Sequence, residues 1–141
     1  KVSSMQIFNA RERTYPYLYT ALGFGFWAYL LIAVLHAPAY ISLVAVGATI
    51  AIGLVAGINH WWKISAHLTG LGGLLGGVLS FCLGCGIMPS WGMLSGWLAA
   101  TLVLMWARLY LNAHTSAQVA AGWLLGLSCT FFPYAIACYV S

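Results

Sequence analysis

Two short polar patches interrupt an otherwise apolar chain and carry the residues best suited to chemistry. They lie at residues 63–67 and 107–118. Arginine and lysine bind phosphate oxygens, and histidine titrates near neutral pH, so that it can serve as a nucleophile or as a general acid. We expect the two patches to meet in space and to bind a phosphate. Together they supply two cations, one hydroxyl and two histidines: Lys63, Arg108, Ser65, His67 and His114.

Each patch also precedes an apolar run at which we expect a helix to start. Thr115 followed by Gln118 fits the Thr-x-x-Gln capping box. Ser65 is predicted to cap the other helix, which leaves His67 in its first turn. If that turn extends back to Lys63, the lysine and His67 share one helix face. Free N–H groups at helix starts attract anions, so both starts favour a phosphate site.

The composition makes lipid the solvent of this chain. Of its 141 residues, 63% are hydrophobic and 4% are charged, whereas a soluble domain carries about 25% charged residues. Five cations form no basic stripe, so we expect no nucleic acid partner. Glu12 is the only acidic residue. A carboxylate-held Mg²⁺ is therefore not expected, and we predict neither a metal nor a cofactor.

Five apolar runs of about the length that crosses a hydrocarbon core divide the chain. We predict an all-α polytopic membrane helix bundle that forms a single domain over residues 1–141. Residues 1–15 are expected to form a polar entry segment, Pro16 to occupy the first turn of the first helix, and Pro133 to kink the last. The predicted helices are residues 17–35, 40–58, 67–83, 91–109 and 117–139.

Threading these helices places all six charged residues at one end of the bundle, together with three of the four histidines. We call it the near end. One explanation is the bias of Lys and Arg toward cytoplasmic loops. The other is a single anion site, which the histidines favour because topology bias does not require them. The side of the membrane stays open.

The third run is rich in small residues. Gly72 with Gly76 and Gly73 with Gly77 form two Gly-x-x-x-Gly patterns, which predict close helix packing. The four cysteines lie in apolar runs, where cysteine packs as a small hydrophobe. We favour this interpretation for the Cys-x-x-Cys at residues 82–85 over a metal or redox site.

The later patch resembles the third motif of the type-2 phosphatidic acid phosphatase superfamily, a family of integral membrane lipid phosphatases. That motif reads Ser-Arg-x5-His-x3-Asp, and its register here holds Ala107, Arg108, His114 and Gln118. Ala107 lacks the hydroxyl of the family's serine. Gln118 replaces an aspartate that would orient the histidine and balance its charge. In serine proteases the analogous change from Asp to Asn lowers the rate about 10⁴-fold.

The earlier patch resembles the family's second motif, Pro-Ser-Gly-His, which here reads Ile64-Ser65-Ala66-His67. The first motif, Lys-x6-Arg-Pro, has no match, and Arg11 or Arg13 before Pro16 is expected to take part of its role. The resemblance covers most of the chain and is best from residue 61 onward. The family has six helices, so it implies one further helix before residue 1.

The resemblance also implies roles for the site residues. His114 would be the nucleophile and His67 the acid that protonates the leaving group, while Arg108, Ser65 and Lys63 would hold the phosphate. The implied activity is hydrolysis of a lipid-linked phosphate or pyrophosphate monoester through a phosphohistidine. The implied location is the bacterial inner membrane, among membrane lipids.

Two alternatives stay open. The chain could be an inactive subunit of a larger membrane complex that keeps the family fold, as the glutamine at position 118 and the missing first motif suggest. It could also be a haem-binding anchor that uses two of His60, His67 and His114 as axial ligands.

Overall fold

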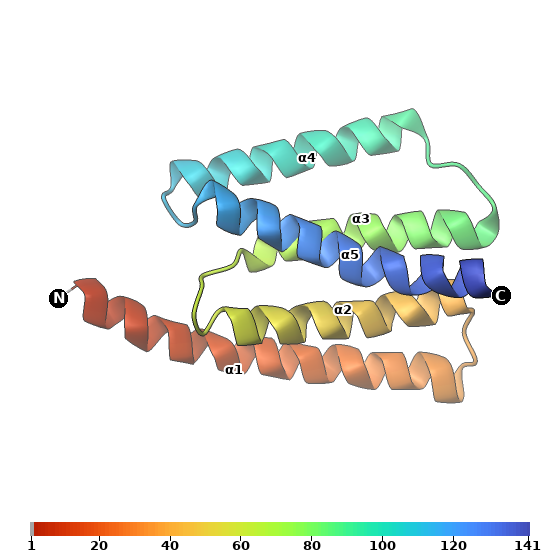
Figure 1. The fold of residues 1–141 in the computed structure, drawn as a ribbon, viewed down its shortest axis with the longest axis horizontal. Helices are drawn as coiled ribbons and strands as arrows, with labels where there is room; N and C mark the ends of the chain where they lie inside the picture. The colour runs from red at the N-terminus through yellow and green to blue at the C-terminus, as the bar shows by residue number, and fades with distance from the viewer. Residues whose placement is uncertain (1) are drawn as a thin grey trace.

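The computed structural model describes residues 2–141, with side chains described at residue 12 and from residue 14 onward. Throughout this part the chain is helical, with short connections and no strand (Figure 1). The elements are α1 (Val2–Tyr29), the π-helix η1 (Leu30–Val34), α2 (Ala39–Ile58), α3 (Ala66–Cys85), α4 (Trp91–Tyr110) and α5 (Ser116–Val140). The predicted all-α architecture is therefore confirmed.

Among the described residues, five helices are long and apolar enough to span a membrane: Thr14–Val34, Ala39–Ile58, Ala66–Cys85, Trp91–Tyr110 and Ser116–Val140. These spans match the predicted ones to within three residues at either end. Hydrophobic runs of spanning length fold as helices because lipid offers no partner for the backbone N–H and C=O groups. The chain is thus a polytopic membrane protein.

The prediction for the first helix was wrong at its start. Pro16 lies inside α1, which already begins at Val2. The polar segment before Pro16 contains no glycine or proline, so nothing in it breaks the helix, and a proline within a helix removes only one backbone N–H donor. The Thr20 hydroxyl donates a hydrogen bond of 2.8 Å to the Pro16 carbonyl.

The helices run alternately in opposite directions, so their connections gather at two ends (Figure 1). The linker at residues 59–65 and the turn at residues 111–115 lie together at the near end, as the threading predicted. The turns at residues 35–38 and 86–90 lie at the far end. The bundle therefore carries both polar patches on the same side.

Glycines bring α3 and α5 into close contact. The backbone of Trp123 covers Gly72, and Thr130 covers Gly76, so that a Cβ at either glycine would collide with α5. The predicted Gly-x-x-x-Gly packing is confirmed here. A second such pattern on α5, Gly122 with Gly126, faces α3 from the other side. This double contact fixes the starts of α3 and α5 relative to each other.

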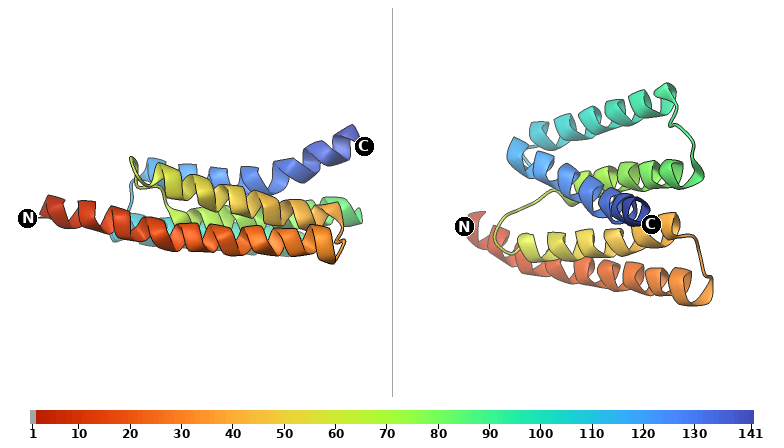
Figure 2. Two further views of the ribbon diagram at one scale, coloured as in Figure 1. Left: turned by 90° about the horizontal axis from the view of Figure 1, so that it is seen from below. Right: turned by 45° about the vertical axis from the view of Figure 1, so that its right-hand side comes forward.

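The remaining helices pack less evenly. α1 lies along α2, and α2 in turn contacts both α3 and α5. α4 stays near α5 at the near end and diverges from α3 toward the far end (Figure 1). The C-terminal part of α5, which contains Pro133, turns away from the direction of its first part (Figure 2). This bend agrees with the kink predicted at the proline.

Candidate active site

Two hydrogen bonds join the polar patches. The backbone N–H of Ser65 donates to the carbonyl of Gln118 over 3.3 Å. The Nδ1 atom of His114 lies 3.0 Å from the carbonyl oxygen of Lys63. The predicted meeting of the two patches in space is therefore confirmed, and it is the start of α5 that holds the start of α3.

The bond to Lys63 fixes the tautomer of His114. A carbonyl oxygen can only accept, so Nδ1 must carry the proton and donate it. In the neutral imidazole the other nitrogen, Nε2, then holds a free lone pair. A nitrogen with a lone pair and a fixed ring orientation is what a nucleophile requires.

The surroundings also favour the neutral form of His114. Its pKa is lowered, chiefly by partial burial and further by the charges of Lys63 and Arg108. The hydrogen bond to the Lys63 carbonyl and the nearby Gln118 amide act in the opposite direction and offset part of this effect. The neutral form of the imidazole is therefore favoured over the charged one.

His67 and Arg108 approach the same point from α3 and α4. His67 lies in the first turn of α3 with an exposed side chain, close enough to Arg108 and His114 to interact with both electrostatically. Arg108 is half-buried in the last turn of α4. A cation there suits the negative end of the helix dipole. Three helices thus contribute to one cluster.

Both cations of the cluster are free to bind an anion. Within the described part of the chain, neither the Arg108 guanidinium nor the Lys63 ammonium has a hydrogen-bond or ion-pair partner. The Lys63 side chain is exposed. It lies in the linker before α3, which begins only at Ala66, so the condition for a helix face shared with His67 is not met.

Ser65 occupies the N-cap position of α3 but does not act as predicted. Its side chain makes no capping hydrogen bond, and its Oγ has no partner. The residue is fully buried, with 0% of its surface exposed. The Ser65 carbonyl instead accepts bonds from the N–H of Thr69, at 3.0 Å, and from its hydroxyl, also at 3.0 Å. In this conformation the Ser65 hydroxyl cannot reach a ligand.

The start of α5 behaves as predicted. Thr115 accepts a bond of 3.3 Å from the N–H of Gln118, and the Gln118 side-chain oxygen accepts one of 3.0 Å from the N–H of Thr115. The capping box is therefore confirmed. Gln118 serves the cap, and its side chain also lies close to the imidazole of His114.

The remaining predicted residues lie around this cluster or outside the described side chains. Ala107 is half-buried in α4. The side chains of Arg11 and Arg13 lie outside the described residues, although their backbone belongs to α1. His60 is exposed and packs edge-on against Trp61, with ring centroids 6.2 Å apart.

The described residues contain no group of three or more His, Cys, Asp or Glu side chains placed to hold a metal ion. The cysteines at positions 82 and 85 are both free, one buried and one exposed.

Sequence reasoning missed the two backbone bonds that join the patches, since the carbonyl partners of His114 and Ser65 have no side-chain signature. The glycine pair at positions 122 and 126 carried a signal that could have been used. It shows the same spacing as the pair at positions 72 and 76.

No family model, no characterised protein and no solved structure matches this chain.

Proposed function

We propose that this protein hydrolyses a lipid-linked phosphate or pyrophosphate monoester at the near end of its bundle, through a phosphohistidine intermediate. One observation supports the proposal above the others. The nitrogen Nδ1 of His114 is held by the Lys63 carbonyl, which leaves Nε2 with a free lone pair near two cations that have no partner among the described residues. The two cations, Lys63 and Arg108, supply the positive charge that phosphate oxygens require.

In the first step, Nε2 of His114 attacks phosphorus. A P–N bond forms as the P–O bond to the lipid alcohol breaks, and the leaving oxygen takes a proton from His67. Arg108 and Lys63 stabilise the charge that the three equatorial oxygens carry in the transition state. The free N–H groups at the starts of α3 and α5 add to this stabilisation.

In the second step, a water molecule attacks the phosphohistidine. His67, now neutral, takes the proton of that water, the P–N bond breaks, and inorganic phosphate leaves. His114 recovers its lone pair and His67 its proton, so the cycle closes with one water consumed. Every acid and base in this scheme belongs to the chain itself.

The anionic head group and the apolar helices indicate a lipid as the carrier of the phosphate. The cluster lies at the end of membrane-spanning helices, where a head group meets the hydrocarbon core. A water-soluble phosphate could bind the same charges, but it would gain nothing from their position at the membrane surface. The proposal includes the membrane, for which we favour a bacterial inner membrane.

A second candidate function is that of an inactive subunit of a membrane complex with the same fold. Two observations favour it. The Gln118 oxygen is engaged in the cap of α5, and a neutral amide does not balance an imidazolium. The Ser65 hydroxyl is closed off from any ligand. Such a protein would bind phosphate without turning it over.

The release of inorganic phosphate from a panel of lipid phosphates in detergent separates the two candidates. The natural protein should release phosphate, His114→Ala should not, and Gln118→Asp should be faster because a carboxylate stabilises the imidazolium. Release that persists in His114→Ala would contradict the assigned nucleophile. No release by the natural protein and none by Gln118→Asp would favour the inactive subunit.

A further inference from the structure

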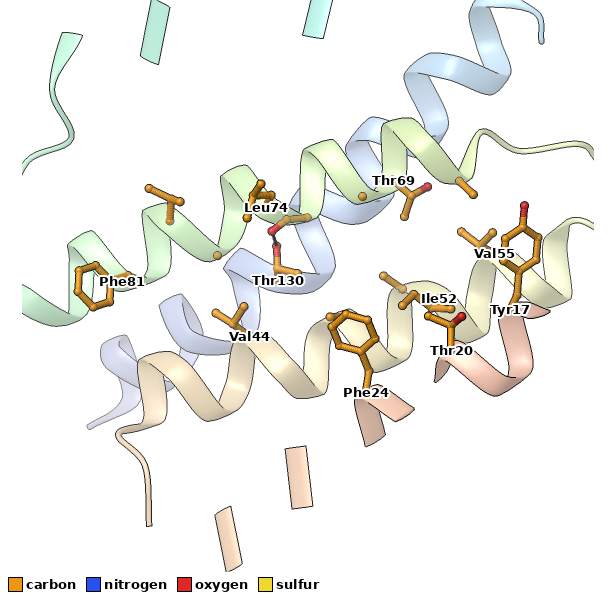
Figure 3. Close-up of a pocket in the computed structure, with 17 residues that line it drawn as sticks. Tyr17, Thr20, Phe24, Val44, Ile52, Val55, Thr69, Leu74, Phe81 and Thr130 are labelled. Atoms are coloured by element: carbon orange, nitrogen blue, oxygen red, sulfur yellow. Dashed lines mark hydrogen bonds between the residues drawn. The ribbon is translucent and has the colours of Figure 1, made fainter. Parts of the chain in front are cut away.

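A cavity of about 640 Å³ lies between α1, α2 and α3 and begins beside the candidate active site. Tyr17 and Thr69 lie at one end of it and Phe81 at the other (Figure 3). Ala66, at its near end, directly precedes His67 in the sequence. On α3 the cavity-lining Gly70 and Leu74 lie three and seven residues after His67, and residues so spaced share a helix face.

The walls of the cavity come from α1, α2 and α3, and Thr130 of α5 adds to the lining. α2 forms its floor, while α1 and α3 both pack on α2 without contacting each other. The gap between them stays open because α3 presents glycine there. A Cβ at Gly70 would meet no atom within 4 Å. The absence of side chains therefore creates the space.

The cavity surface offers almost no polar partner. Three hydroxyls in its wall already donate to backbone carbonyls: Thr20 to Pro16, Thr69 to Ser65, and Thr130 to Gly73. The rest of the lining is apolar except for the Tyr17 hydroxyl, which lies at the near end. Water needs two to four polar partners to occupy a cavity, so hydrocarbon is the better occupant.

The shape of the cavity limits that occupant to something thin. From Ala66 to Phe81 the α3 wall is about 22 Å long at about 1.5 Å per residue. Dividing the volume by this length gives a cross-section of about 30 Å². A helix about 10 Å across has a cross-section of about 80 Å², so the space is better matched to a single flexible chain than to a partner helix.

We propose that this cavity receives the single hydrocarbon chain of the lipid phosphate whose head group binds at Arg108, Lys63, His67 and His114. The inference rests on the proposed function and adds where the chain of the substrate lies. A narrow apolar cavity with cations at one end that have no partner among the described residues matches an amphiphile with an anionic head and one apolar tail. At about 1.2 Å per bond, 22 Å accommodates roughly 18 bonds of an extended chain.

Gly70 offers a direct way to block the cavity. Gly70→Leu adds a side chain where no atom lies nearby, so the helix itself is not disturbed. Gly70 lies about 6 Å along α3 from Ala66, so the introduced leucine side chain leaves room for roughly 5 carbon–carbon bonds of a hydrocarbon chain. The matched control is Gly96→Leu. Gly96 is also exposed and free of neighbours within 4 Å, but it lies on α4, away from the cavity.

The test compares phosphate release from butyl phosphate and hexadecyl phosphate by the natural protein and both variants. Gly70→Leu should lose 10- to 100-fold in kcat/KM on hexadecyl phosphate, because a displaced chain shifts the phosphate out of line with the nucleophile. It should keep its activity on butyl phosphate, and Gly96→Leu should resemble the natural protein on both. Equal activity of the two variants on hexadecyl phosphate would overturn the proposal.

A binding experiment tests the cavity as the chain site independently of catalysis. If the natural protein releases no phosphate, that result counts against the proposed function alone. The probe is hexadecyl phosphate with a photoreactive diazirine at the end of its chain. Cross-links at Val78 and Phe81 that disappear in Gly70→Leu would support the cavity as the chain site. Cross-links spread over exposed α4 residues such as Leu98 and Leu102, and unchanged in Gly70→Leu, would overturn it.

Discussion

The starts of α3 and α5 look alike in sequence and differ in structure. Ser65 and Thr115 both precede their helix with an extended backbone, at φ −83° and −85°. Thr115 caps its own helix through a complete capping box. Ser65 makes no such bond, and its N–H is held by the Gln118 carbonyl of α5. The start of α5 is capped by its own residues, whereas the start of α3 is held by a hydrogen bond to α5.

This difference shows how the site is assembled. The start of α5 is fixed locally and can therefore serve as the reference that positions the linker before α3. The imidazole of His114 takes part in this because it bonds to the Lys63 carbonyl. The proposed nucleophile is thereby also a structural link between the two patches. Changes at the start of α5 should accordingly have larger effects than changes at the start of α3.

The largest effect is expected for His114→Asn. The asparagine amide can still donate to the Lys63 carbonyl, so the link between the patches persists, but no lone-pair nitrogen remains. We expect phosphate release to fall by about 10⁴-fold or more, as when a nucleophile is removed from other hydrolases. The matched control is His60→Asn, another near-end histidine but one outside the cluster. Similar losses in both variants would indicate a general disturbance of the near end.

A smaller loss is expected for Gly122→Ala. A Cβ at this position would lie 2.5 Å from the Ser65 carbonyl oxygen, and backbone atoms cannot move aside cheaply. α5 would shift away from the start of α3 and misalign His114 with the cations, at a cost of about 100-fold in kcat. The kinetic assay should be paired with Gly57→Ala, since Gly57 has open space around it. An unaffected Gly122→Ala would contradict the described contact between α3 and α5.

A shift in pH dependence is expected for Lys63→Gln. The Lys63 charge lowers the pKa of His114, so removing it should raise that pKa. The His114 imidazole would then stay protonated up to a higher pH, so the acidic limb of the kcat/KM profile should shift to higher pH. The backbone carbonyl that holds Nδ1 is unchanged by this substitution. NMR titration of the His114 imidazole gives the pKa directly, and a constant or lower value would refute the assigned electrostatics.

The smallest effects separate the two caps. Thr115→Ala removes a capping hydrogen bond and should lower the free energy of unfolding in detergent by about 1 kcal/mol. Ser65→Ala removes a buried hydroxyl that has no partner, so it should leave stability unchanged or raise it by about 1 kcal/mol. A loss in Ser65→Ala equal to that in Thr115→Ala would mean that the Ser65 hydroxyl does act as a cap.

The sequence predicted the helices well because hydrophobic length and turn residues are local signals. The predicted start of the first helix was wrong at Pro16. The residues around Pro16 favour a helix strongly enough that α1 continues past the one backbone N–H donor that the proline lacks. The capping box at Thr115 was predictable for the same local reason. The cap at Ser65 was not, because its outcome depends on the carbonyl of Gln118, which lies 53 residues away in the sequence.

The candidate site was predictable in its members and not in their contacts. Topology alone placed the cations and histidines at one end of the bundle. The tautomer of His114 and the burial of Ser65 depend on how closely α5 approaches α3, which the glycines at positions 122 and 126 determine. The cavity beside α1 was not predicted, because its volume arises where α1 and α3 stay apart, and no sequence pattern marks such a gap.

The central claim is that His114 carries the phosphoryl group, and trapping this intermediate tests it most directly. The natural protein is mixed with a lipid phosphate, quenched in alkali within one turnover, digested, and analysed by mass spectrometry. The claim predicts a phosphoryl group on the peptide that contains His114, stable in alkali, lost in acid and absent from His114→Asn. Phosphate release without any such adduct, or an adduct on another residue, would contradict it.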